Sequence, residues 1–257
     1  MSSVVQSAPA RPGLRAWGEL VKCESKMVAR DTAGIVVPVA LPLLILVMNA
    51  AGANDEVITR GRTALDIHVL PLILAMVVAM VGIINMPSFL AYYRRTGILR
   101  RLSTTPASPA MVLGAQAVVS VIQVTTGLAM ALAVAVLGFG ANLPVNLGVA
   151  LGVLVLSMLA MYAVGMMVAA LAPTPNSAVA IGLVVFFALG ALGGMFGGTD
   201  ALPDAVATVG AWLPFGATVE ALSASWAGAG VEASHLLAMA ITTVVGGVVA
   251  AVTFRWD

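Results

Sequence analysis

The sequence predicts an all-α membrane protein with six transmembrane helices, an N-terminal interfacial helix and an outer re-entrant segment before the last span. Of its 257 residues, 61% are hydrophobic and only 9% are charged, against roughly 25% charged in soluble domains. The charges gather in short clusters between long apolar stretches. So few charged side chains cannot cover a soluble core of this size, so most of the chain is expected to lie in lipid.

Six apolar stretches are long enough to span a bilayer, because a hydrocarbon layer of about 30 Å requires about 20 helical residues. Within lipid every backbone N–H and C=O needs a partner in the chain, so helices are expected rather than strands. The spans are placed near residues 33–52, 68–90, 110–138, 145–171, 177–197 and 233–254. Four prolines in the first two spans, Pro38, Pro42, Pro71 and Pro87, predict kinks.

Two segments outside the spans are expected to lie at the membrane surface. Residues 1–32 form the N-terminal region, where Trp17 and other apolar residues recur at helical spacing among basic ones. This pattern is typical of a helix in the membrane plane, and a disordered basic tail is the alternative. Residues 198–232 are too polar and too rich in Gly and Pro to span. We expect them to dip into the outer leaflet, with Trp212 and Trp226, like Trp17, as interface anchors.

The distribution of Lys and Arg predicts the orientation, because these cations resist translocation. Ten of the twelve flank one side, and Arg60 and Arg62 flank the other. Both termini, and the loop at residues 91–109, are therefore expected in the cytoplasm, and residues 33–257 form one transmembrane domain. The Ala-, Val- and Gly-rich composition is associated with GC-rich bacteria, so we expect the chain in a bacterial plasma membrane.

The densest functional signal is the cytoplasmic segment YYRRTGILRRLSTTPASPAMVLG, residues 92–114. It predicts a short amphipathic helix with an apolar side and a cationic side, ended by Pro106, after which Pro109 starts a new helix. Such a rigid knob is suited to contact with a soluble partner. For any single arginine, retention on the cytoplasmic side and binding to lipid phosphate remain the simpler explanation.

This segment closely resembles the cytoplasmic loop of type-2 ATP-binding-cassette (ABC) permeases, the drug, lipid and polysaccharide exporter class. ARDTAGIVVPVALPLLILVM is similar to the interfacial helix and first span of that family, and WLPFGATVEALSASW to its re-entrant element. The resemblance implies that the loop docks on an ATPase subunit. The residues it implies at this contact are Arg94, Arg95, Gly97, Leu99, Arg101, Leu102, Thr105 and Pro106.

The chain has no G-x-x-x-x-G-K-[ST] sequence, so it cannot bind ATP through a Walker A loop. The resemblance therefore implies two copies of a separate ABC ATPase, which hold the ATP and magnesium, and a second permease, either a copy of this chain or a homologue. No cofactor, metal site or catalytic residue is expected on this chain, and no nucleic acid partner. His68 and His235 lie near the outer ends of spans, where isolated histidines are ordinary.

No span carries an ionisable residue near its centre, and such residues mark ion and proton pathways. A secondary carrier is therefore disfavoured, although it stays an alternative together with a permease for a lipid-linked glycan. Gln116, Ser120 and Gln123 share one face of the third span. This stripe either lines a pathway or forms hydrogen bonds between helices. The neutral and apolar spans predict export of amphipathic or hydrophobic molecules, as in multidrug efflux and antibiotic resistance.

Overall fold

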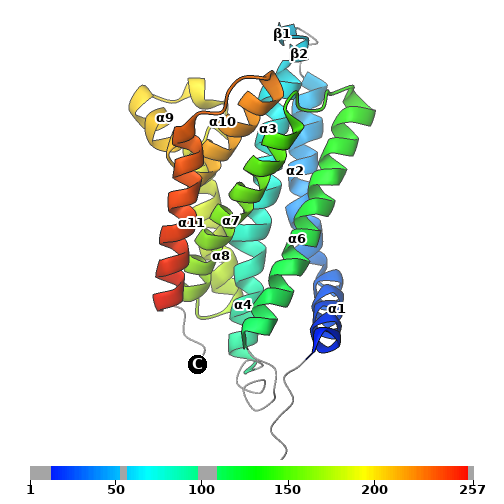
Figure 1. Cartoon of the computed structure of the whole chain (residues 1–257), viewed down its shortest axis with the longest axis vertical. Coiled ribbons are helices and arrows are strands. Elements are labelled where there is room, and N and C mark those ends of the chain that lie inside the picture. Colours follow the sequence, from blue (N-terminus) through cyan, green and yellow to red (C-terminus); the bar gives the residue numbers. More distant parts are fainter. Residues whose placement is uncertain (1–12, 53–56, 98–108, 254–257) are drawn as a thin grey trace, which may run out of the picture.

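The computed structural model describes residues 13–52, 57–97 and 109–253 and forms an elongated bundle of helices that stand side by side (Figure 1). In this described part, six helical stretches are long and apolar enough to cross a membrane. They comprise Gly34–Gly52, Leu65–Arg95, Met111–Gly138, Leu147–Leu171, Pro175–Leu192 and Ala233–Thr253. The predicted fold class is confirmed. The second span is longer than predicted at both ends, and the fifth ends before the predicted residue 197.

The elements follow one another along the chain with few interruptions. The first span is α2 (Thr32–Gly52), and the second is one continuous helix made of η1 (Leu65–Val69), α3 (Leu70–Ala79), η2 (Met80–Asn85) and α4 (Met86–Arg95). The third span is α6 (Pro109–Ala133) with η3 (Val134–Gly138). The fourth, fifth and sixth spans are α7 (Leu147–Leu171), α8 (Pro175–Leu192) and α11 (Ala233–Thr253). The remaining elements are α1 (Leu14–Arg30), β1 (Val57–Thr59), β2 (Arg62–Thr63), η4 (Thr199–Ala201), α9 (Asp204–Ala211) and α10 (Pro214–Ala227).

The second span is the central element of the bundle. In its most apolar stretch 83% of the residues are buried, against 22–39% in the other five spans. Two π-helical turns, η1 and η2, interrupt it, and a proline follows each of them by two residues: Pro71 after η1 and Pro87 after η2. A proline cannot bond to the carbonyl four residues before it, and a π turn relieves the resulting collision.

Two glycines allow neighbouring spans to cover the carbonyls of η2. A Cβ atom on Gly165 of α7 would lie 1.9 Å from the oxygen of Gly82, and one on Gly182 of α8 would lie 2.6 Å from the oxygen of Ile83. Pro87 has no N–H to offer these carbonyls; in the π register of η2, where the Met86 N–H bonds to the Val81 oxygen five residues back, the carbonyl that loses its donor is that of Gly82. In lipid such a carbonyl needs protein cover, so glycine is required at both positions.

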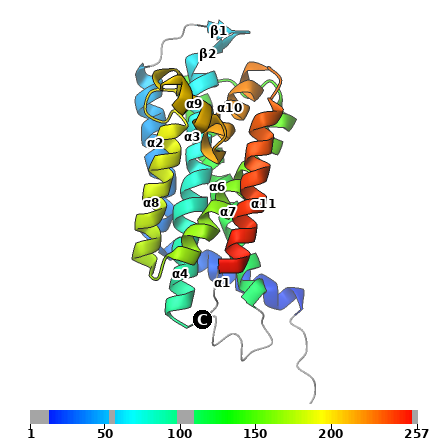
Figure 2. The ribbon, with the colours of Figure 1, turned by 90° about the vertical axis from the view of Figure 1, so that its left-hand side faces the viewer.

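Helix α1 lies across the end of the bundle at which α4 ends (Figure 2). Asp31 separates it from α2, and its side chain accepts a hydrogen bond from the Gly34 backbone N–H at 3.1 Å. This bond satisfies one of the free N–H groups in the first turn of α2. The chain therefore turns sharply from a surface helix into the first span.

The opposite end of the bundle carries α9, α10 and the β1–β2 hairpin (Figure 1). Helices α9 and α10 meet at 86°, and Pro214 lies in the first turn of α10. A Cβ atom on Gly210 would lie 1.9 Å from the Leu192 oxygen, so α9 packs directly on the end of α8. The hairpin was not predicted, and its Arg60 and Gly61 both have positive φ, 46° and 74°, as a tight hairpin turn requires.

The two tryptophans at this end of the bundle differ from each other. Trp212, at the corner between α9 and α10, is 52% exposed, as an interface anchor would be. Trp226 is 1% exposed, and its indole N–H donates to the Asn142 backbone oxygen at 3.0 Å. Trp226 is therefore packed inside the protein, whereas its predicted level at the lipid headgroups stays a prediction. Its N–H finds a buried protein acceptor, so the ring does not need water at its polar edge.

Replacement of Gly165 by alanine tests the close packing on the second span. The added methyl group would force α7 away from η2, and overpacking of this kind costs about 1–3 kcal/mol or more. We expect a lower melting temperature in detergent and less monodisperse protein for Gly165→Ala. Gly152→Ala is the matched control in the same helix, because a Cβ atom there meets nothing within 4 Å. Equal melting temperatures for the two variants would refute this account of the packing.

Candidate functional site

The end of α4 holds the first residues of the segment that the sequence assigns to the ATPase contact. Arg95 is exposed, whereas Arg94 is only partly exposed. The Arg94 guanidinium donates hydrogen bonds to the backbone oxygens of Ala169, at 3.1 Å, and Ala172. These carbonyls end α7, where helix carbonyls lack partners and a cation is favoured. Gly97 has φ +66° and ends α4 in the left-handed conformation that glycine adopts without strain.

Five residues of the predicted contact, Leu99, Arg101, Leu102, Thr105 and Pro106, lie outside the described residues. The described structure resumes at Pro109, which begins α6 as the sequence predicts. Of the predicted contact residues, the structure therefore places Arg94 and Arg95 in the last turn of α4, and Gly97 two residues after it.

A buried pair joins α1 to the same turn of α4. The Tyr93 hydroxyl donates a hydrogen bond to the Glu24 carboxylate, and the two side chains are only 2% and 7% exposed. Burial raises the pKa of Glu24, although the hydrogen bond from Tyr93 opposes the rise. Sequence reasoning missed this pair, because Glu24 stands among exposed charges of an amphipathic helix. Three successive residues, Tyr93, Arg94 and Arg95, thus face α1, α7 and the surface, respectively.

The polar stripe of the third span faces the interior of the protein. Gln116 and Ser120 are 2% and 1% exposed. The Gln123 side chain donates to the Gly34 backbone oxygen at 2.5 Å and accepts from Asn85 at 2.8 Å. Asn85 also donates to the Gly34 oxygen, at 3.0 Å. Gln123 therefore connects the first, second and third spans, and no sequence pattern indicated that Asn85 would be its partner.

Asp66 braces the opposite end of the bundle. It is completely buried, and its carboxylate accepts from the backbone N–H of Thr63 at 3.1 Å and from that of Asn142 at 2.7 Å. The Asn142 side-chain amide also donates to this carboxylate, at 3.0 Å. The Trp226 indole N–H in turn donates to the Asn142 backbone oxygen. A carboxylate that accepts several hydrogen bonds can be buried at low cost in free energy. The role of Asp66 in this chain is therefore structural.

A polar cavity of about 740 Å³ lies beside this brace. Its polar lining comes from the end of α2, η1, η4, α10 and the region where α11 begins: Asn49, His68, Thr199, Glu220, Ser223, Glu232 and His235. The two histidines of the sequence thus line one cavity. In the described residues no group of three or more His, Cys, Asp or Glu side chains could hold a metal ion.

Trp17 is half-buried on α1. Its indole nitrogen lies 3.7 Å from the position that a Cβ atom on Gly114 of α6 would take. The ring therefore packs against the third span along part of its surface, and a role at the lipid interface remains a prediction.

The Glu24–Tyr93 pair predicts a pH dependence of stability. Because the folded pKa of Glu24 lies above its ordinary value of 4.5, the folded state holds the proton more tightly than the unfolded state. This contribution to stability is complete below the ordinary value and is lost as pH rises through the raised pKa. As pH rises from 4.5 through the raised pKa of Glu24, we expect the melting temperature of the wild type to fall relative to that of Glu24→Gln, whose side chain stays neutral. Glu19→Gln, an exposed change on the same helix, should follow the wild type; a pH profile of Glu24→Gln identical to the wild type would contradict the prediction.

Comparison with curated protein sequences finds no match. Comparison with protein-family models finds one that covers residues 15–226 and is described as ABC-2 type transporter. The matched region runs from α1 through five spans to the end of α10, and so includes residues 92–114, the segment predicted to contact an ATPase, and the polar stripe. It covers most of the chain. This chain is therefore a multi-pass membrane protein that belongs to the ABC-2 type transporter family, as a membrane-spanning permease.

Proposed function

We propose that this chain is the translocating subunit of an ATP-driven exporter and that a separate ABC ATPase, present in two copies, supplies the energy. The observation that carries the proposal is the family membership of a chain whose sequence holds no ATP-binding loop. ATP and magnesium would be held by the ATPase. A second permease, a copy or a homologue, would complete the transporter.

The end of α4 is suited to receive force from such a partner. Arg95 is exposed in the loop at residues 91–109, which we call the coupling segment because it is predicted to contact the ATPase. The two residues before it, Tyr93 and Arg94, have partners within the protein. Arg94 binds the last carbonyls of α7, and Tyr93 binds Glu24 of α1. A displacement of this turn would therefore act on α1, on α7 and on the central span at once.

The character of the spans supports an amphipathic or hydrophobic cargo, such as a drug, an antibiotic or a lipid-like molecule. Within the described spans, the polar side chains of the middle third are neutral amides and hydroxyls, such as Gln123 and Ser120. A proton- or ion-coupled carrier would need titratable groups there. Multidrug efflux and antibiotic resistance are the activities that such neutral and apolar spans favour. The polar cavity of about 740 Å³ would then be the place where the cargo is released.

The arrangement of helix ends supports a cytoplasmic location of both termini. Helix α1, the end of α4 and the end of α11 all lie at one end of the bundle, opposite the β1–β2 hairpin (Figures 1 and 2). The arginine-bearing end would face the cytoplasm of a bacterial cell. The hairpin and the polar cavity would then face outward.

Co-purification and transport assays test the proposed function. We expect detergent-extracted protein from native membranes to carry an ATPase subunit, and reconstituted transport to require ATP and to stop with vanadate. Arg95→Glu combined with Arg101→Glu should lower ATP-driven transport by about tenfold or more, since like charges brought together at an interface cost several kcal/mol, while membrane insertion is unchanged.

Arg15→Glu is the matched control, because it reverses an exposed charge on α1 outside the coupling segment. Absence of an ATPase partner together with transport that ignores ATP and vanadate would refute the proposed function. Unchanged transport in the double variant would refute the coupling role of this loop but would leave the rest of the proposed function standing.

Cysteine labelling tests the orientation. In a Cys23→Ser background we expect a membrane-impermeant maleimide to label Ile58→Cys in intact cells, because Ile58 is 53% exposed on the hairpin. Thr104→Cys should be labelled only after the membrane is opened. Labelling of Thr104→Cys from outside intact cells would invert the topology and end the coupling model.

A further inference from the structure

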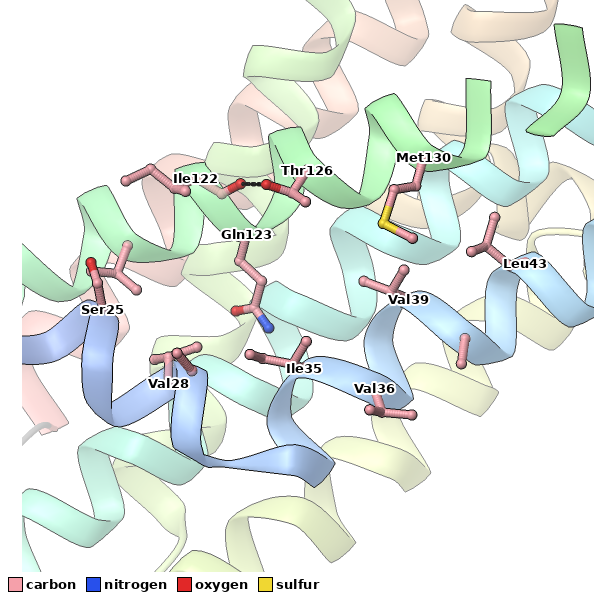
Figure 3. A pocket seen from close by; sticks show the side chains of 13 residues that line it. Ser25, Val28, Ile35, Val36, Val39, Leu43, Ile122, Gln123, Thr126 and Met130 are labelled. Carbon is pink, nitrogen blue, oxygen red and sulfur yellow. Dashed lines mark hydrogen bonds between the residues drawn. The ribbon is translucent and has the colours of Figure 1, made fainter. Parts of the chain in front are cut away.

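A groove of about 410 Å³ lies between α1, α2 and α6 (Figure 3). Its walls are apolar, and Figure 3 shows side chains from all three helices directed into it. They include Val28 from α1, Ile35, Val39 and Leu43 from α2, and Val119 and Met130 from α6. The rim is open to the surroundings of the bundle, since Val36 is 48% and Ile122 is 52% exposed.

The polar groups of the groove already have partners within the protein. The Gln123 amide bonds to Gly34 and Asn85, as described above. The Thr126 hydroxyl donates to the Ile122 backbone oxygen at 2.8 Å, and the Ser25 hydroxyl donates to that of Val21 at 2.8 Å. A ligand with hydrogen-bonding groups would gain little here. The groove therefore favours a hydrocarbon chain, which gains contacts along its whole length.

Cations stand at the α1 end of this groove. Lys22, Lys26 and Arg30 follow one another at four-residue intervals, so they form one row on α1, and all three are exposed. Ser25 and Ala29, which line the groove, lie on the same face as Lys22 and Lys26. Glu19 lies 3.7 Å from Lys22, but both side chains are more than 60% exposed, and exposed pairs of this kind are weak.

We propose that this groove binds an acyl chain of an anionic phospholipid, whose phosphate lies on the row formed by Lys22, Lys26 and Arg30. Basic residues at a membrane surface attract anionic headgroups, and the apolar walls would enclose the chain directly below them. The bound lipid would fill the space between α1 and the first and third spans. The inference depends only on the chain being embedded in a membrane, and it is independent of cargo and transport direction.

The lipid would act together with the Glu24–Tyr93 bond. Glu24 is buried against α4 on one side of α1, whereas Ser25 and Ala29 border the groove on another. The helix is thus held to the second span by the Glu24–Tyr93 bond and to the first and third spans by direct packing, and the lipid would fill the groove left between these contacts. An anionic lipid should therefore raise the melting temperature of the wild type more than a neutral lipid with the same chains.

Native mass spectrometry of the full-length chain in detergent, with defined lipids added, tests the inference. We expect phosphatidylglycerol to be retained and phosphatidylcholine with identical acyl chains to be lost. Lys22→Gln/Lys26→Gln/Arg30→Gln should weaken phosphatidylglycerol binding by about tenfold or more. Ala40→Phe, which places a ring in the groove lining, should abolish retention of this lipid. Ala51→Phe, the same change at an exposed position of α2 outside the groove, should leave it intact.

Several results would overturn the proposal. Equal retention of the two lipids by the wild type, or equal thermal stabilisation by them, would refute selection by charge. Unchanged phosphatidylglycerol binding in Ala40→Phe would show that the acyl chain lies elsewhere. If Ala40→Phe converted a dimer to a monomer with lipid binding unchanged, the groove would belong to a second copy of this chain. The thermal comparison uses the unaltered protein, so it stands even if a variant fails to fold.

Discussion

The architecture depends on the contact between the carbonyl oxygens of η2 and the glycines of two neighbouring spans. Pro87 has no N–H to offer the carbonyls of η2, and lipid provides no replacement. Gly182 and Gly165 bring α8 and α7 so close that they cover Ile83 and Gly82. Because these two helices enclose the second span, this span becomes the most buried element of the protein. The remaining spans then pack around it with large apolar faces left for lipid or for other subunits.

From this central span the structure extends to both functional ends. At one end, Tyr93 and Arg94 tie the last turn of α4 to α1 and α7. At the other, Asp66 ties η1 to the segment after α6, and Trp226 adds α10 to the same site. Buried polar side chains that bond to neighbouring helices therefore lie at both ends of the bundle and in the Asn85–Gln123 cluster.

Much of the fold could be predicted from the sequence, because lipid restricts the choice to helices of a known length. The six spans and the surface helix follow from hydrophobicity and charge, and the family followed from the loop motif. The partners of individual polar residues could not be predicted in this way. Trp226, Glu24 and Asn85 are buried or paired through contacts between helices distant in sequence, and a helical period does not specify which helix stands opposite. The close contacts of Gly165 and Gly182 could not be predicted either, since a glycine's position in the sequence does not show which backbone lies opposite it.

The second span has one further property that follows from its length. Its 31 residues extend over about 46 Å at about 1.5 Å per residue, whereas the hydrocarbon layer is about 30 Å thick. The surplus must project into the polar regions, and the described residues place Arg94 and Arg95 at that projecting tip. Since the middle of the span is clamped by α7 and α8, it can serve as a fulcrum. If the span tilts by a few degrees about this clamped middle, its arginine end and its η1 end move in opposite directions. The span therefore has the proportions of a lever that crosses the bilayer.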